Sequence, residues 1–298
     1  MKSGKIKSSI IFSLLAVQAW ILTNSFFAAF FAAAIFFAVF ARPKNQSQSE
    51  IVLEVIGLKV SVALPSGGRR FVLNGVDLKI WAGEVHAIVG SNGSGKSSFA
   101  RTVLGDPAYF IEFGQISPLK DLTPSERANL GFFVSWQSPV DVPGVTNFVL
   151  LHAGENARRR ETGDEELSPL SFREICKSRL AEVGAGWLES FLDKSVNEGL
   201  SGGERKNVEL LALCVLRPRR VVILDEIDSG LDVDAVSAFS QVLGKLRKLT
   251  PDLSFILITH HTPLMAVEKV HVMSGGKIYE SGGVEILKKI NSYGFDKV

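Results

Sequence analysis

The sequence predicts an α/β fold built on a parallel sheet, and three features support this. A glycine-rich stretch, "GSNGSGKSS" at 90–98, lies between a short apolar run and a segment that continues as a helix. Two further runs, "RRVVILDE" at 219–226 and "SFILITHH" at 254–261, are continuously apolar. Such runs are typical of strands that are buried on both faces of a parallel sheet. Between them, "DAVSAFSQVLGKLRKL" has the apolar spacing of a helix.

The elements before the glycine-rich stretch are predicted from alternation and from turn residues. Residues 51–64, "IVLEVIGLKVSVAL", alternate and are β-branched, which favours a strand. A turn at "GGRR" leads to a second strand, "FVLNGVDLKI", and "GEVHAIVG" reads as a short buried third strand. "KSSFARTVLG" is expected to be a helix, and "VHVMSGGKIYESGG" at 270–283 a late hairpin. The first strands predict an antiparallel β subdomain beside the parallel-sheet core.

The chain changes character between Pro118 and Ser195, where it becomes helix-rich and charged. We therefore predict an inserted helical subdomain at about 116–196. Within it, "ARRRETGDEE" at 157–166 is expected to be an exposed loop whose charges are solvated.

The first fifty residues differ from the rest. Lys2, Lys5 and Lys7 precede 34 residues, from Ser8 to Ala41, that carry no charge. As one helix this run would extend roughly 50 Å, more than the roughly 30 Å of a bilayer core. Four interpretations stay open: a targeting leader, an N-out anchor, a shallow hairpin, or a start codon assigned too early. We expect residues 1–50 to be a leader or membrane anchor followed by a polar linker, and 51–298 to be the folded domain.

Charge and cysteine content limit the classes of function. Of the 33 basic and 31 acidic side chains, residues 1–50 hold five basic and one acidic, which leaves 28 basic and 30 acidic for 51–298. A body so close to neutrality is not expected to bind nucleic acid. The two cysteines, Cys176 and Cys214, lack the CxxC spacing of a metal site and are expected to be core thiols.

The glycine-rich stretch matches G-x-x-x-x-G-K-[ST] in its required place between a strand and a helix. Its backbone N–H groups are predicted to surround the phosphates of ATP, with Lys96 neutralising the β and γ oxygens and Ser97 ligating Mg²⁺. The residues of this predicted phosphate site are Gly90, Ser91, Asn92, Gly93, Ser94, Gly95, Lys96, Ser97 and Ser98.

A second set of candidates follows the apolar run "VVILDE". The buried strand would deliver Asp225 to the metal, and Glu226 is placed to polarise a water molecule against the γ-phosphate. Ser201, Gly202 and Gly203 lie where a helix should begin, and a helix start is an anion site. The chain thus carries two phosphate-binding turns.

In this sequence "LSGGE" at 200–204, Gln137 in "SWQSP", "SGLD" at 229–232 and His260 resemble the motifs of ABC-type ATPases, in that family's order. The resemblance spans most of 51–298. It implies that Gln137 contacts Mg²⁺ or water and acts in catalysis with Glu226, and that His260 contacts the γ-phosphate. It also implies that Ser201–Gly203 faces ATP held by a second copy, so that a transient ATP-dependent homodimer forms.

Within that family, "QSPVDVPGV", "SVNEGLSGGERKN" and "ILDEIDSGLDVDA" look like SufC-type ATPases of SUF iron–sulfur cluster assembly. This resemblance implies SufB and SufD scaffold proteins as partners, and a cytoplasmic or plastid-stroma location with possible membrane association through residues 8–41. The pattern departs at Leu200, Arg205, Ser91 and His261, none of which removes a phosphate-contacting group. The alternatives are the nucleotide-binding subunit of an ABC transporter with a separate permease, and an ATP-gated module without hydrolysis.

The adenine contact is the least defined part of the predicted site. No aromatic residue lies between Ile51 and Arg70, where the resemblance would place an adenine-stacking ring. An apolar contact from Val60 or Val62 is the expected substitute.

Overall fold

The computed structural model describes residues 50–64, 67–135, 141–259 and 264–293. The predicted leader or anchor lies outside these residues. Within the described ranges, no helix combines the length and the apolar character needed to cross a bilayer.

A three-stranded antiparallel sheet forms, which confirms the predicted antiparallel β subdomain, although its third strand at 109–117 was not predicted. Strand β1 (Ile51–Ala63) is central, between β2 (Arg69–Trp81) and β4 (Tyr109–Ser117). Alternation directs Leu53 and Val55 of β1 into a core in which they are almost fully buried, and a register shift after Val55 brings Leu58 into the same core. This sheet is separate from the main sheet and packs over helix α2 (Lys96–Leu104).

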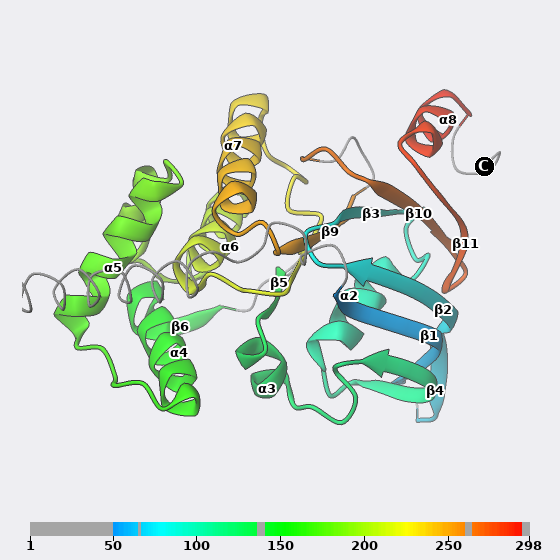
Figure 1. Cartoon of the computed structure of the whole chain (residues 1–298), viewed down its shortest axis with the longest axis horizontal. Helices are drawn as coiled ribbons and strands as arrows, with labels where there is room; N and C mark the ends of the chain where they lie inside the picture. The colour runs from blue at the N-terminus through cyan, green and yellow to red at the C-terminus, as the bar shows by residue number, and fades with distance from the viewer. Residues whose placement is uncertain (1–49, 65–66, 136–140, 260–263, 294–298) are drawn as a thin grey trace, which may run out of the picture. The chain divides into compact units, whose positions relative to one another are not determined.

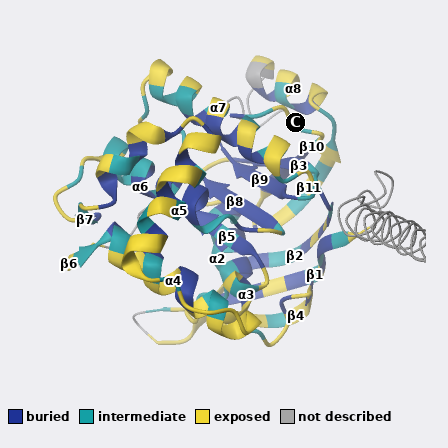
Figure 2. Ribbon diagram, turned by 60° about the vertical axis from the view of Figure 1, so that its left-hand side comes forward, coloured by how far each residue is buried: buried dark blue, intermediate teal, exposed yellow. Residues whose placement is uncertain are grey.

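The main sheet has six strands in the order β11-β10-β3-β9-β8-β5. Strands β10, β3, β9, β8 and β5 run parallel to one another, and β11 joins β10 as an antiparallel hairpin, which confirms the predicted core and the late hairpin. The strands are β3 (Val85–Val89), β5 (Phe132–Ser135), β8 (Val221–Asp225), β9 (Ser254–Ile258), β10 (Lys269–Ser274) and β11 (Lys277–Gly282). Figure 2 shows β3, β8 and β9 as buried along their length.

Burial on both faces explains why these strands are apolar throughout. Successive side chains of a strand point to opposite faces. Ile223 and Ile256 accordingly pack with Phe99 of α2 on one face. On the other, Val222 and Phe255 pack with helices α6 (Gly202–Leu216) and α7 (Val233–Leu249).

The remaining helices are mostly in the middle of the chain, and α4 and α5 lie apart from the antiparallel sheet in Figure 1. They begin at capping residues: the side chains of Thr123, Thr146 and Ser168 accept hydrogen bonds at the starts of α3, α4 and α5. The other elements are α3 (Pro124–Asn129), β6 (Val142–Thr146), α4 (Asn147–Thr162), α5 (Pro169–Glu182), the 3₁₀ helix η2 (Gly186–Phe191), β7 (Ser195–Val196) and α8 (Glu285–Tyr293).

One prediction for this region is wrong in part. The first six residues of the stretch 157–166 are not loop but the last turns of α4. Arg158 pairs with Glu155 one turn earlier, 2.6 Å from its Nη2 to Oε2, and its Nη1 donates to the carbonyl of Leu216. These contacts stabilise the helix past the point where its charge suggested a loop. The limits of the helical subdomain stay a prediction: α4 and α5 lie inside 116–196, whereas β5, also inside it, belongs to the main sheet.

Candidate nucleotide-binding site

The candidate site forms where β3, β9 and β8 end side by side. Because these neighbours are parallel, their carboxyl ends share one edge of the sheet, which is where open α/β sheets bind ligands. The loop 90–95 follows β3, and Asp225 ends β8. The backbone N–H of Asp225 donates to Ser135 Oγ at 3.0 Å, so β5 fixes the end of β8 from the other side.

The phosphate loop depends on close backbone approach. A Cβ at Gly90 would lie 2.2 Å from the carbonyl oxygen of Met273 in β10, so only glycine fits there. Lys96, the first residue of α2, turns back over the loop, and its Nζ donates to the carbonyls of Gly90 at 2.8 Å and Ser91 at 3.1 Å. Burial lowers the pKa of Lys96, while the carboxylates of Glu226 and Asp225 act in the opposite direction. The loop is therefore closed around a buried cation.

Asp225 has the features of a metal ligand. It is 4 % exposed, and its Oδ1 is buried without a hydrogen-bond partner in the part of the chain that the structure describes. Burial raises the pKa of this carboxyl, and a hydrogen bond from Ser97 lowers it in part. A bound cation would satisfy the orphaned oxygen, and hydroxyl and carboxylate oxygens are ligands that Mg²⁺ accepts. Ser97 and Asp225 thus fit the predicted metal site.

Glu226 leaves the strand in an unusual backbone conformation. Its φ is 52°, in the left-handed region that a non-glycine residue adopts at a cost. The conformation is held at both ends, because its N–H donates to Ile258 at 2.9 Å and its carbonyl accepts from Lys206 Nζ at 3.0 Å. Lys206 lies on α6, which begins at Ser201–Gly203, here called the signature turn. This helix therefore reaches the backbone of Glu226, the predicted catalytic residue.

A hollow of about 810 Å³ is lined by Lys96, Ser97 and Glu226 among others. Its lining includes Phe71, which is 49 % exposed on β2. The expected apolar contact is not available from Val60, which is fully buried in the central strand. A contact from Val62 stays a prediction, although Val62 does not line the hollow. The lining residues are Arg70, Phe71, Val72, Asn74, Asn92, Gly93, Ser94, Gly95, Lys96, Ser97, Ser98, Glu226, Ser229, Gly275 and Gly276.

The signature turn is formed as a helix start but lies away from this hollow. Ser201 caps α6 in a capping box: its Oγ accepts from Glu204 N–H at 3.3 Å, and Glu204 Oε2 accepts from Ser201 N–H at 3.0 Å. A hydrogen bond from Lys194, followed by that from the Ser201 backbone, lowers the pKa of Glu204 to about 2. Neither Ser201, Gly202 nor Gly203 is among the residues that line the hollow.

Two predicted site residues, Gln137 and His260, lie outside the described residues. Sequence reasoning missed Phe71, Asn74 and the Gly275–Gly276 turn, all of which line the hollow. Phe71 directly follows Arg70, just outside the range 51–70 in which the resemblance places the adenine-stacking residue. No local signal marks Asn74 or the Gly275–Gly276 turn, because the hydrogen bond between them joins residues about 200 positions apart.

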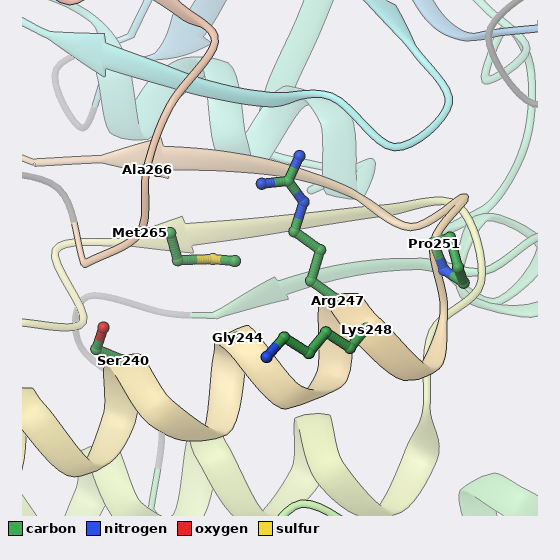
Figure 3. Close-up of a pocket in the computed structure, with 7 residues that line it drawn as sticks. All are labelled: Ser240, Gly244, Arg247, Lys248, Pro251, Met265 and Ala266. Atoms are coloured by element: carbon green, nitrogen blue, oxygen red, sulfur yellow. The ribbon is translucent and has the colours of Figure 1, made fainter.

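A second hollow, of about 600 Å³, lies along the C-terminal half of α7. Figure 3 shows Arg247 extending from the helix toward the neighbouring strands, and Met265 facing the helix. Arg247 is already paired with Glu268, 2.6 Å from Nη2 to Oε1. This hollow holds none of the predicted site residues.

The fold and the site together define a P-loop nucleotide-binding protein. The model of the ABC transporter family matches residues 73–229, and the chain belongs to this family. It is an ATPase, and its cofactors are ATP and Mg²⁺.

Individual relatives and solved structures agree with this assignment. The chain is 41% identical over 255 residues to the "Probable ATP-dependent transporter ycf16" of Pyropia yezoensis, covering 83% of this chain and 98% of that protein. It is also 41% identical over 254 residues to "ABC transporter I family member 6, chloroplastic" of Arabidopsis thaliana, covering 83% and 73%. A solved dimer of the ATP-binding cassette MJ0796 with ADP and Pi has the same fold, with a TM-score of 0.65, 19% identity, and coverage of 78% of this chain and 98% of that chain.

Proposed function

We propose that this ATPase is the SufC-type subunit that drives conformational change in SufB- and SufD-like scaffold proteins during iron–sulfur cluster assembly. The motifs "QSPVDVPGV" and "SVNEGLSGGERKN" support this assignment. Residues 51–298 form its ATPase domain. The protein acts in the cytoplasm or the plastid stroma, and residues 8–41 are the candidate for a membrane tether.

Within this proposal each site residue has a chemical role. Lys96 and the backbone N–H groups of residues 90–98 hold the phosphates, and Ser97, Asp225 and Gln137 hold Mg²⁺, which neutralises charge that develops on the phosphates. Glu226 orients a water molecule and accepts its proton. His260 contacts the γ-phosphate. Without nucleotide Lys96 donates to the carbonyls of Gly90 and Ser91, and when ATP binds it would donate to phosphate oxygens instead.

The second phosphate turn belongs to a partner copy. The hollow around Lys96 lacks Ser201–Gly203, so one protomer supplies only half of the contacts that the motifs provide. A head-to-tail homodimer would place the helix start at Ser201 over the γ-phosphate of the other copy, where the helix dipole favours negative charge. ATP would thus hold the two copies together, and hydrolysis would release them.

The proposed coupling to a scaffold rests on one observation, an ion pair between Asp141 and Arg205. Asp141 follows the Gln137 segment, and its Oδ1 lies 2.9 Å from Arg205 Nη1 on α6. Beyond it, Val142, Val149 and Leu150 are 38%, 55% and 48% exposed. An exposed apolar surface of this kind suits a protein partner. Movement of the signature helix would therefore reach that surface directly.

The test is to purify the affinity-tagged chain from its own cells with ATP, with a Lys96→Ala chain as the control. We expect β-rich scaffold proteins to co-purify, and Val149→Asp combined with Leu150→Asp to lose them while keeping ATP hydrolysis. Recovery of an integral permease instead would favour the transporter subunit, which the names of the relatives also suggest.

A further inference from the structure

The turn between β10 and β11, at Gly275 and Gly276, is wedged between strand β2 and the phosphate loop. Asn74 of β2 holds it through two hydrogen bonds: its Nδ2 donates to the Gly275 carbonyl at 2.8 Å, and its backbone N–H donates to the Gly276 carbonyl at 2.8 Å. A Cβ at Gly276 would lie 2.6 Å from the Val72 carbonyl and 2.9 Å from Asn74 Nδ2. The turn therefore lies against β2 with no space between them.

The opposite side of the same turn holds the phosphate loop. The N–H of Gly276 donates to the carbonyl of Ser94 at 2.8 Å. A trans peptide bond directs its C=O and its N–H in opposite directions. Fixing the Ser94 carbonyl toward the turn thus directs the N–H of Gly95 away from the turn, and Gly95 lines the hollow. The orientation of one anion-binding N–H is set by a hairpin nearly two hundred residues further along the chain.

We propose that Asn74 is a positioning residue for the phosphate loop, acting through the Gly275–Gly276 turn on the Gly95 N–H. This inference rests on the proposed assignment of residues 90–98 to the phosphates. In this role Asn74 keeps the loop in its binding conformation before the nucleotide arrives. Loss of its side-chain hydrogen bond weakens binding of the phosphates without unfolding the domain.

The first experiment compares Asn74→Ala with Lys79→Ala, measuring ADP·Mg²⁺ affinity by calorimetry. Lys79 lies on the same strand, and it pairs with Glu54, away from the turn. The Kd for ADP is expected to rise about threefold to tenfold in Asn74→Ala, the loss that one hydrogen bond typically produces, and to stay within twofold in Lys79→Ala. Both variants should melt within a few degrees of the wild type.

Hydrogen exchange then separates positioning from general loosening. Without nucleotide, peptides that cover 90–98 should exchange faster in Asn74→Ala, and peptides from α6 should not change. An unchanged Kd, or a weaker Kd with unchanged exchange at 90–98, would overturn the proposal.

A glycine pair gives a second test that does not involve Asn74. Gly275 and Gly276 have φ values of 54° and 77°, so alanine is strained at both positions. Only at Gly276 does a Cβ meet β2; at Gly275 nothing lies within 4 Å. The Kd for ADP should therefore rise more in Gly276→Ala than in Gly275→Ala. Equal values would contradict a role for the close packing of Gly276 against β2.

A Lys96→Ala variant tests the phosphate site separately from the role of Asn74. It should abolish ADP binding. If Lys96→Ala binds ADP normally, the assignment of the phosphate loop is wrong. If it loses binding while Asn74→Ala does not, the site stands and Asn74 is not a positioning residue.

Discussion

His86 Nδ1 and His271 Nε2 are 2.9 Å apart inside the main sheet, and the two rings are stacked with centroids 5.1 Å apart. The chain of hydrogen bonds continues at both ends, from His86 Nε2 to Glu84 Oε2 at 2.9 Å and from His271 Nδ1 to Ser281 Oγ at 2.8 Å. Burial disfavours the charged form of both rings. With both rings neutral, His86 donates to the Glu84 carboxylate, which can only accept, so the other nitrogen of His86 accepts from His271, and His271 accepts from the Ser281 hydroxyl.

This arrangement predicts a loss of stability in acid. Burial, then the neighbouring His86 and Lys269, lower the pKa of His271 to about 3; burial also lowers the pKa of His86, although Glu84 and Glu268 oppose this. As the pH falls, the unfolded chain takes up protons first, near pH 6.5. The contribution of these histidines to the free energy of unfolding is therefore complete above pH 6.5 and is lost as the pH falls toward 3. His271 contributes a slope of about 1.4 kcal/mol per pH unit.

Urea unfolding at pH 7, 6 and 5 checks this, with His271→Gln as the matched variant. The free energy of unfolding of the wild type should fall more steeply with acid than that of the variant. Parallel curves would show that the histidine pair does not carry the effect.

Glu226→Gln should bind ATP but hydrolyse it slowly. The amide cannot accept the proton of the attacking water, and the loss of such a group typically costs 10²–10⁴-fold in rate. Steady-state phosphate release measures turnover, and calorimetry measures binding. Hydrolysis at near the wild-type rate would remove Glu226 from the mechanism.

Ser201→Arg should keep ATP binding and lose ATP-dependent dimerisation, because the new side chain fills the turn that faces the partner's phosphate. Light scattering in the Glu226→Gln background, where ATP persists, measures the mass. A dimer of normal stability would contradict the composite site. Mixing Ser201→Arg with Lys96→Ala should restore part of the hydrolysis, since one of the two sites in a mixed dimer is intact.

Glu155→Gln should destabilise the helical region. Glu155 is 1 % exposed and lies between Arg158 and Arg179, at 2.6 Å and 3.3 Å. Those arginines donate to the carbonyls of Leu216 and Val215 at the end of α6. Leaving them without a counter-charge should cost about 3–5 kcal/mol, measured by urea unfolding. Glu174→Gln, which breaks an exposed pair with Lys177, should cost less than about 1 kcal/mol.

The two cysteines should be inert in the folded protein. Both are free and buried, and burial raises the pKa of Cys176 to about 11 and of Cys214 to about 12. The thiolate is the reactive form, so at pH 8 a thiol reagent should label neither until the chain unfolds. Fast labelling that leaves the fold intact would disprove this. Cys176→Ser combined with Cys214→Ser should retain ATPase activity if it folds.

By itself the sequence determined those parts of the protein that depend on neighbours along the chain. The phosphate loop is set by its glycines and by Lys96 at the start of a helix, and the signature turn by Ser201 and Glu204, which form a capping box three residues apart. Asp225 could be placed because an apolar strand buried on both faces must end at the sheet's binding edge. In each case the local backbone fixes the geometry.

Only the tertiary structure decided which distant side chains complete the site. Phe71, rather than Val60, lines the hollow because β2 and not the central strand β1 borders it. Asn74 reaches Gly275 between the two sheets, and His86 reaches His271 across paired strands, and each contact joins residues about 200 positions apart. Nothing in the local pattern specifies such contacts, because their partners are selected by strand order and register, which are settled only when the whole core packs.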